Sequence, residues 1–183
     1  MLKKMRGFTL IEMLIVVAII GILAALLIPN AMSALQKARQ KGTVKDINTF
    51  ATGLMDYVTD KGMAPAGGQG QLTSDQDTVP KALQGFYLKV VPTKDQWGHY
   101  FYVYTGTGCS SNVFIKGSVT YADDDFIVGS SGRNTGTSDA PQFDPTKPGD
   151  SLYDVNTMAD FNKEIANWNG NIIIGPRTAS STT

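Results

Sequence analysis

The stretch RGFTLIEMLIVVAII, residues 6 to 20, decides how the rest of this sequence folds. It opens an apolar segment, Phe8 to Ile28, in which Glu12 is the one ionisable side chain. At about 1.5 Å of rise per residue, this segment forms a helix of about 30 Å, which matches the hydrocarbon thickness of a bilayer. The sequence therefore predicts a transmembrane helix near the N-terminus.

The basic residues around this segment predict its orientation. Lys3, Lys4 and Arg6 precede it, and the next basic residue is Lys37. Because positive charge is retained on the cytoplasmic side, we expect a single pass with the N-terminus in the cytoplasm and the remainder outside the inner membrane.

Two ordinary interpretations of this segment, a secretory signal and a plain membrane anchor, fit it poorly. A secretory signal has an apolar stretch of about 7 to 15 residues and a cleavage site between small residues, and Leu27 to Ala31 matches such a site poorly. A plain membrane anchor fits the length, but an unpaired carboxylate near the bilayer interior costs a few kcal/mol. An ionisable side chain at this depth therefore predicts a function for Glu12.

The hexapeptide Gly7 to Glu12, GFTLIE, after a short basic leader, resembles the class III signal of type IV pilins and pseudopilins. The resemblance implies that prepilin peptidase cuts between Gly7 and Phe8 and methylates the new amine of Phe8. It also implies an assembly role for Glu12, whose carboxylate would pair with the Phe8 amine of a neighbouring subunit in a filament. A buried ion pair of this kind favours subunits packed in register.

The helical pattern continues well beyond the apolar segment. Gly21 and Pro29 predict a kink or a local loosening, since proline removes a backbone donor and crowds the preceding turn. From Leu35 to Val58 apolar residues recur at helical spacing, and the glycine-rich stretch from Gly62 to Gly68 predicts the end of the helix.

Shorter elements are expected after this helix. They are a flexible connector at 67–70, a short helix at 80–83, and strands at 99–104, 112–115 and 125–128. The predicted fold class is α+β: a long N-terminal helix, half in the membrane and half amphipathic, packs on a small antiparallel sheet followed by an extended C-terminal loop region. The predicted divisions are a leader at 1–7, a membrane and filament-core helix at 8–28, and a periplasmic head at 29–183.

The composition argues against several classes of function. The 183 residues contain 16 basic and 16 acidic side chains, so no net charge attracts nucleic acid. A single cysteine, Cys109, allows neither an internal disulfide nor a cysteine-based zinc site. His99 is the one histidine, and no nucleophile motif accompanies it, so we expect no enzyme activity.

A second resemblance narrows the family. The segment GFYLKVVPTKDQWGHYFYVYTG, residues 85 to 106, followed by DDDFIVGSSGRN and DFNKEIANWN, is similar to the head of the major pseudopilin of type II secretion systems. The resemblance implies a filament that drives protein secretion, assembled from copies of this chain with other pseudopilins on an inner-membrane platform. The alternative is a major pilin of a surface pilus for adhesion, motility or DNA uptake.

The resemblance also raises the question of calcium. Pseudopilin heads bind calcium in the loop between the last strands, but this sequence has Gly129-Ser130-Ser131-Gly132 where the family has an acidic turn. The loop from Ser130 to Met158 is enlarged and contains several aspartates. Calcium takes six to eight oxygen ligands, and we expect Asp139 and Asp160 to be the best candidates.

Overall fold

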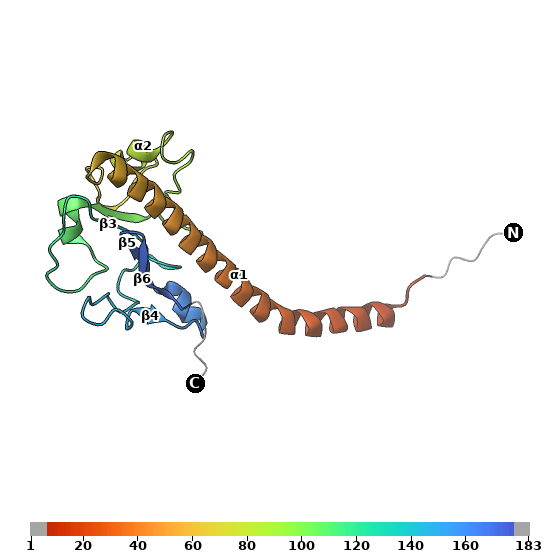
Figure 1. The fold of residues 1–183 in the computed structure, drawn as a ribbon. Helices are drawn as coiled ribbons and strands as arrows, with labels where there is room; N and C mark the ends of the chain where they lie inside the picture. Colours follow the sequence, from red (N-terminus) through yellow and green to blue (C-terminus); the bar gives the residue numbers. More distant parts are fainter. Residues whose placement is uncertain (1–6, 178–183) are drawn as a thin grey trace. The chain divides into compact units, whose positions relative to one another are not determined.

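A computed structural model gives the fold and describes residues 7–177 (Figure 1). The chain divides into two compact units, Met1–Lys37 and Ala38–Thr183. Helix α1, Leu10–Lys61, contributes to both units and ends where the sequence predicts. The expected segments 1–7, 8–28 and 29–183 concern processing and the membrane, which this fold does not test, so they stay predictions. Residues 1–6 of the leader lie outside the described residues.

The second unit contains a six-stranded sheet in the part of the chain that the structure describes. The elements after α1 are β1 (Gln69–Gln71), α2 (Thr78–Leu83), β2 (Tyr102–Thr105), η1 (Gly106–Ser111), β3 (Phe126–Ser130), β4 (Leu152–Tyr153), η2 (Met158–Asn162), β5 (Ile165–Trp168) and β6 (Asn171–Pro176). The strand order is β1-β2-β3-β5-β6-β4, and every pairing is antiparallel except that of β4 with β6. This arrangement confirms the predicted α+β class.

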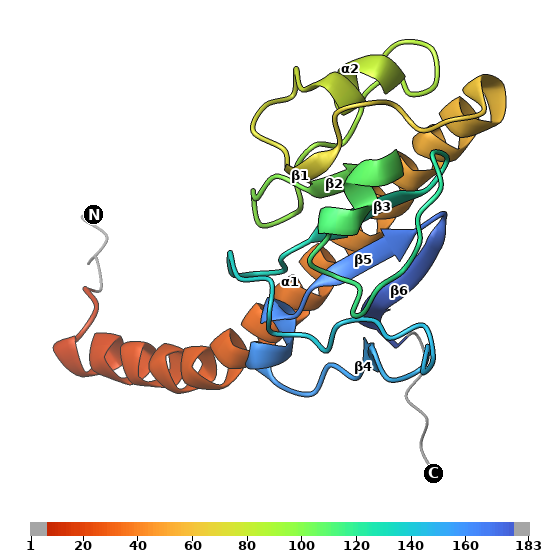
Figure 2. The same cartoon turned by 90° about the vertical axis from the view of Figure 1, so that its left-hand side faces the viewer.

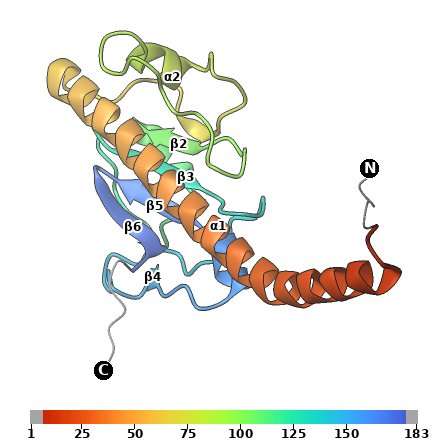
Figure 3. The ribbon, with the colours of Figure 1, turned by 90° about the vertical axis from the view of Figure 1, so that its right-hand side faces the viewer.

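One face of the sheet packs on the second half of α1, as Figures 2 and 3 show. Ile47, Phe50 and Leu54 are fully buried and recur at the spacing of one helical face. They join a core that includes alternate residues of the strands, such as Val103 and Val128. The predicted amphipathic half of the helix therefore supplies this core.

The opposite face of the sheet has a core of its own. Tyr104 and Ile127, which alternate with the residues that face α1, pack here with Phe114, Phe143 and Tyr153. The last two belong to the enlarged loop region. Because this region covers the second face, all five residues of β3 are buried. The enlarged loop, expected as an extended region after the sheet, thus contributes side chains to the folded core of the head.

Two expected local structures are wrong. Residues 112–115 are not a strand, because the side-chain oxygen of Asn112 accepts the backbone N–H groups of Phe114 (2.9 Å) and Ile115 (2.7 Å) and forms a turn. Residues 67–70 are not simply a connector, because β1 begins at Gln69 and pairs with β2.

The glycine at position 68 explains how β1 reaches the sheet. The Gly68 N–H donates to the Thr105 hydroxyl (3.1 Å), and a Cβ at Gly68 would lie 2.7 Å from that oxygen. The short helix α2 and the strands β2 and β3 agree with the predicted elements within a few residues.

Candidate functional site

The start of α1 is fixed by a capping box between Thr9 and Glu12. The Glu12 carboxylate oxygen Oε2 accepts the Thr9 backbone N–H (2.8 Å) and the Thr9 hydroxyl (2.7 Å), and the Thr9 hydroxyl accepts the Glu12 N–H (3.3 Å). This is the reciprocal pattern that satisfies the free donors of a helix N-terminus. Glu12 therefore has a role within a single chain that the sequence interpretation overlooked, although the spacing Thr-x-x-Glu signals it.

The capping box leaves Gly7 and Phe8 outside the helix. Both residues are exposed and have no regular secondary structure, while α1 begins at Leu10. The Gly7–Phe8 bond therefore lies in an exposed segment that is not part of the helix.

The first part of α1 is an apolar helix without a protein partner in the described chain. An 18-residue window of α1 has a mean hydropathy of 3.0, and none of it is buried. Leu10, Val17 and Leu26 illustrate this surface, each with more than 60% of its area exposed. By length and composition this helix can cross a membrane, and its surface must be covered by lipid or by other helices.

The helix continues through Gly21 and Pro29. Pro29 has no N–H for the preceding turn, and nearby the Asn30 side-chain amide approaches the Leu26 carbonyl oxygen at 3.5 Å. The kink predicted from Gly21 and Pro29 stays a prediction.

A buried aspartate organises the turn before β2. Asp95 Oδ1 accepts the backbone N–H groups of Trp97 and His99, both at 2.9 Å, and Oδ2 accepts the Ser130 hydroxyl at 2.8 Å. The ring nitrogen Nδ1 of His99 lies 3.1 Å from the Gly132 carbonyl oxygen. The serine donates to the aspartate and not to the histidine, so this group supports a turn and does not form the proton relay of a hydrolase.

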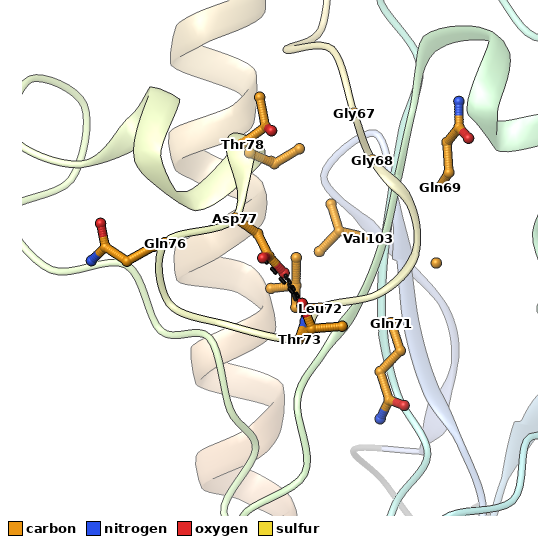
Figure 4. A pocket seen from close by; sticks show the side chains of 12 residues that line it. Gly67, Gly68, Gln69, Gln71, Leu72, Thr73, Gln76, Asp77, Thr78 and Val103 are labelled. Carbon is orange, nitrogen blue, oxygen red and sulfur yellow. Dashed lines mark hydrogen bonds between the residues drawn. The ribbon is translucent and has the colours of Figure 1, made fainter.

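A shallow pocket of about 410 Å³ lies between β1 and α2 (Figure 4). Its lining includes the glycine-rich stretch and no lysine or arginine, so it offers no positive side chain to a phosphate. Asp77, which lines it, accepts the Thr73 and Ser74 backbone N–H groups at 2.7 and 3.2 Å. The carboxylate is therefore used to hold the turn before α2.

Asp160 and Asp139, the predicted calcium ligands, both have protein partners. Asp160 caps η2 by accepting the Thr157 N–H (2.7 Å), and the Lys163 ammonium group, 2.7 Å away, holds the pKa of the Asp160 carboxyl well below its usual value. Asp139 accepts a bond from the Asn134 amide. Among residues 7–177 there is no group of three or more aspartate, glutamate, histidine or cysteine side chains that could hold a metal ion. Calcium binding stays a prediction, in which Asp160 would exchange its present partners for the ion.

Glu164 is the buried carboxylate that the sequence interpretation missed. Only 2% of its surface is exposed, and its two oxygens accept the backbone N–H groups of Asp139 (2.9 Å) and Ala140. The Tyr153 hydroxyl donates to the Glu164 carbonyl oxygen at 3.2 Å. Glu164 thus holds the enlarged loop against the sheet.

A signal for Glu164 was present in the sequence. It directly precedes Ile165 in the run EIANW, which ends at Trp168, and a charge next to a buried strand requires a partner. The partner could not be identified, because it consists of backbone N–H groups 24 and 25 residues away.

Comparison with family models gives two matches to this chain. Residues 2–28 match the prokaryotic N-terminal methylation motif, and residues 30–125 match type II secretion system protein G. The second match covers more than half of the chain and ends before the enlarged loop.

Curated relatives agree with these matches. The chain is 37% identical to the type II secretion system core protein G of Vibrio cholerae over 125 residues, 64% of this chain and 85% of the relative. It is also 37% identical to the protein of the same name from Pseudomonas aeruginosa, over 63% of this chain and 85% of the relative. The Escherichia coli K12 protein of that name is 36% identical over 52% of this chain and 69% of its own length. No solved structure matches the chain significantly.

Proposed function

Because the chain belongs to the type II secretion system protein G family, we propose that it is a major pseudopilin, the structural subunit of a filament that drives protein secretion. The observation that carries this function is the exposed apolar helix with Glu12 at its start, within a match to the N-terminal methylation motif. The match to protein G favours a secretion filament over a surface pilus.

Processing is the first step of the proposed function. Prepilin peptidase cuts the exposed bond between Gly7 and Phe8 and methylates the Phe8 amine, which the methylation-motif match supports. Intact-mass spectrometry of the mature protein should show the loss of residues 1–7 and the gain of one methyl group. A mature protein that retains Gly7 would contradict this step.

Assembly is the second step. All hydrogen bonds that the structure records for the Glu12 carboxylate use Oε2, so Oε1 remains for the Phe8 amine of a neighbouring subunit. The pair removes the cost of an uncompensated carboxylate among apolar helices, and it forms only when the helices are in register.

Glu12→Gln separates this pairing from helix capping. Glutamine also completes a capping box, but it carries no charge to pair with the amine. We expect Glu12→Gln to be inserted and cleaved at the wild-type level but to form few filaments by electron microscopy and shear release. Wild-type filament yield from Glu12→Gln would exclude charge pairing, and Glu12→Asp tests whether the charge alone suffices.

The proposed location is the inner membrane, with the residues before Phe8 in the cytoplasm and the head in the periplasm. The positive charge of Lys3, Lys4 and Arg6 supports this orientation. There the chain meets the assembly platform and the other pseudopilins. In spheroplasts, added protease should digest the head. A head that is protected from the protease would contradict the proposed orientation.

A further inference from the structure

Two segments of the head carry opposite charge. Residues 81–94 contain three lysines, Lys81, Lys89 and Lys94, and no acidic residue. Residues 139–160 contain five aspartates and one lysine, Lys147. The first segment therefore carries a positive charge and the second a negative charge, although the chain as a whole has a net charge of zero.

The basic segment also exposes apolar side chains. Phe86 is 82% exposed and Val90 is 72% exposed. Large apolar side chains at this level of exposure, grouped in one loop, are typical of contact surfaces. We call Lys81, Phe86, Lys89 and Val90 the basic knob.

The loop that carries Phe86 is held firmly. The Gly85 N–H donates to the Leu88 carbonyl oxygen at 2.8 Å, in a turn that needs the positive φ of Gly85 (97°). The Tyr87 ring packs on Tyr57 at 5.3 Å, and the Tyr87 hydroxyl donates to Asp60 at 3.2 Å. Docking of this loop would therefore cost little conformational entropy.

The acidic segment is also held in place. Asp150 and Asp154 are exposed, as are Pro145 and Pro148 between the aspartates. We call these four residues the acidic loop. Its flanks are fixed by the buried side chain of Tyr153 and by the bonds of Glu164 described above.

The two surfaces lie at different ends of the head. Lys81 is on α2, beside β1, and the acidic loop adjoins β4, the last strand at the other edge of the sheet. Figures 2 and 3 show α2 and β4 at opposite ends of this unit. A subunit with two different, complementary surfaces makes head-to-tail contacts, which propagate into a helical filament when the rotation does not close a ring.

We propose that the basic knob of one subunit docks on the acidic loop of a second copy of this chain in the filament. Lys81 and Lys89 face Asp150 and Asp154 across this contact, and Phe86 packs on the exposed prolines. The proposal rests on the proposed function, since it needs a filament of this chain. It assigns the enlarged loop a role in the contact between heads.

Charge reversal with rescue tests the contact in cells that assemble the filament. The full chain with Lys81→Asp and Lys89→Asp should lose most of its filaments, as should the chain with Asp150→Lys and Asp154→Lys. The chain with all four substitutions should regain filaments to at least half of the wild-type yield. Equal thermal unfolding of the four proteins in detergent would show that each head folds.

Disulfide cross-linking gives a second, direct measurement. Cys109 is fully buried, so cysteines introduced on the surface are the reactive ones. With Lys89→Cys and Asp150→Cys in one chain, mild oxidation of filaments should give a ladder of multimers. Either substitution alone should give no ladder, and neither should the control pair Lys116→Cys and Asp150→Cys, in which both residues are exposed.

The outcomes separate this contact from the proposed function. Filaments that form normally in both charge-reversed proteins and give no ladder would overturn the contact and leave the function in place. Absence of filaments from the wild-type chain, in cells with the rest of the secretion system, would overturn the function itself.

Discussion

Asp95→Ala should destabilise the head strongly, because one buried carboxylate joins two distant parts of the fold. The Asp95 side chain is fully buried and accepts three hydrogen bonds, from the N–H groups of Trp97 and His99 and from the Ser130 hydroxyl. Hydrogen bonds to a charged group contribute about 1.5 to 3 kcal/mol each, and water can reach part of the turn after truncation. We expect a loss of about 3 kcal/mol in the free energy of unfolding.

For a unit of this size, a loss of that magnitude lowers the melting temperature by about 6 to 12 °C. The assay is thermal unfolding of the full chain in detergent, followed by near-ultraviolet circular dichroism of Trp97 and Trp168. Asp95→Asn is the matched control, since its oxygen still accepts the two N–H groups, and we expect a loss of about 1 kcal/mol.

A double-mutant cycle isolates the link to β3. Ser130→Ala removes the hydroxyl that donates to Asp95 and accepts the Gly132 N–H at 3.0 Å. Asp95→Ala and Ser130→Ala together should therefore cost less than the sum of the single substitutions, by about 1 kcal/mol. A melting temperature of Asp95→Ala within 2 °C of the wild type, or additive costs, would refute the view of this turn as a buried junction.

Three further predictions concern protonation, reactivity and calcium. Burial raises the pKa of the Glu164 carboxyl above its usual value of 4.5, so the stability that this group contributes is complete below pH 4.5 and is lost as the pH rises through the folded-state pKa. Between pH 4.5 and 7 the free energy of unfolding of the wild type should therefore fall relative to that of Glu164→Gln. Equal pH dependence of the two free energies would contradict this prediction. Burial also raises the pKa of the Cys109 thiol to about 12, so a thiol reagent should react with it only in denaturant, and fast labelling of the native chain would contradict this. If Asp139 and Asp160 bind calcium, added calcium should raise the melting temperature of the wild type and not that of Asp160→Asn. A melting temperature of the wild type that does not change with calcium would exclude calcium binding at these residues.

Sequence reasoning predicted the elements whose signals are local. The helix up to Lys61, the short helix before Leu83 and the strands around Val103 and Val128 follow from periodicity and side-chain type. The segment 112–115 has the composition of a strand, but the Asn112 side chain forms a turn there.

The elements that sequence reasoning missed depend on distant partners. Strand β1 is rich in glycine and glutamine, and it forms because Thr105 bonds the backbone at Gly68. At the candidate site, sequence reasoning proposed a role for Glu12 between subunits, which stays a prediction, and it did not predict the bond of Glu12 with Thr9. Glu164 was missed because its two acceptors meet backbone donors from a loop whose course the sequence does not reveal.

Among residues 7–177 the sheet separates two hydrophobic cores, one against α1 and one beneath the enlarged loop. The match to protein G ends at residue 125, so the loop lies outside the segment that this chain has in common with the family model. The side chains of the loop core lie on the face of the sheet opposite α1, and the Tyr153 hydroxyl links the two sides by accepting the Gln40 side-chain amide of α1 at 3.5 Å. A change in the loop that keeps Tyr153 can therefore reshape the outer surface of the head without altering the helix face on which the inner core is built.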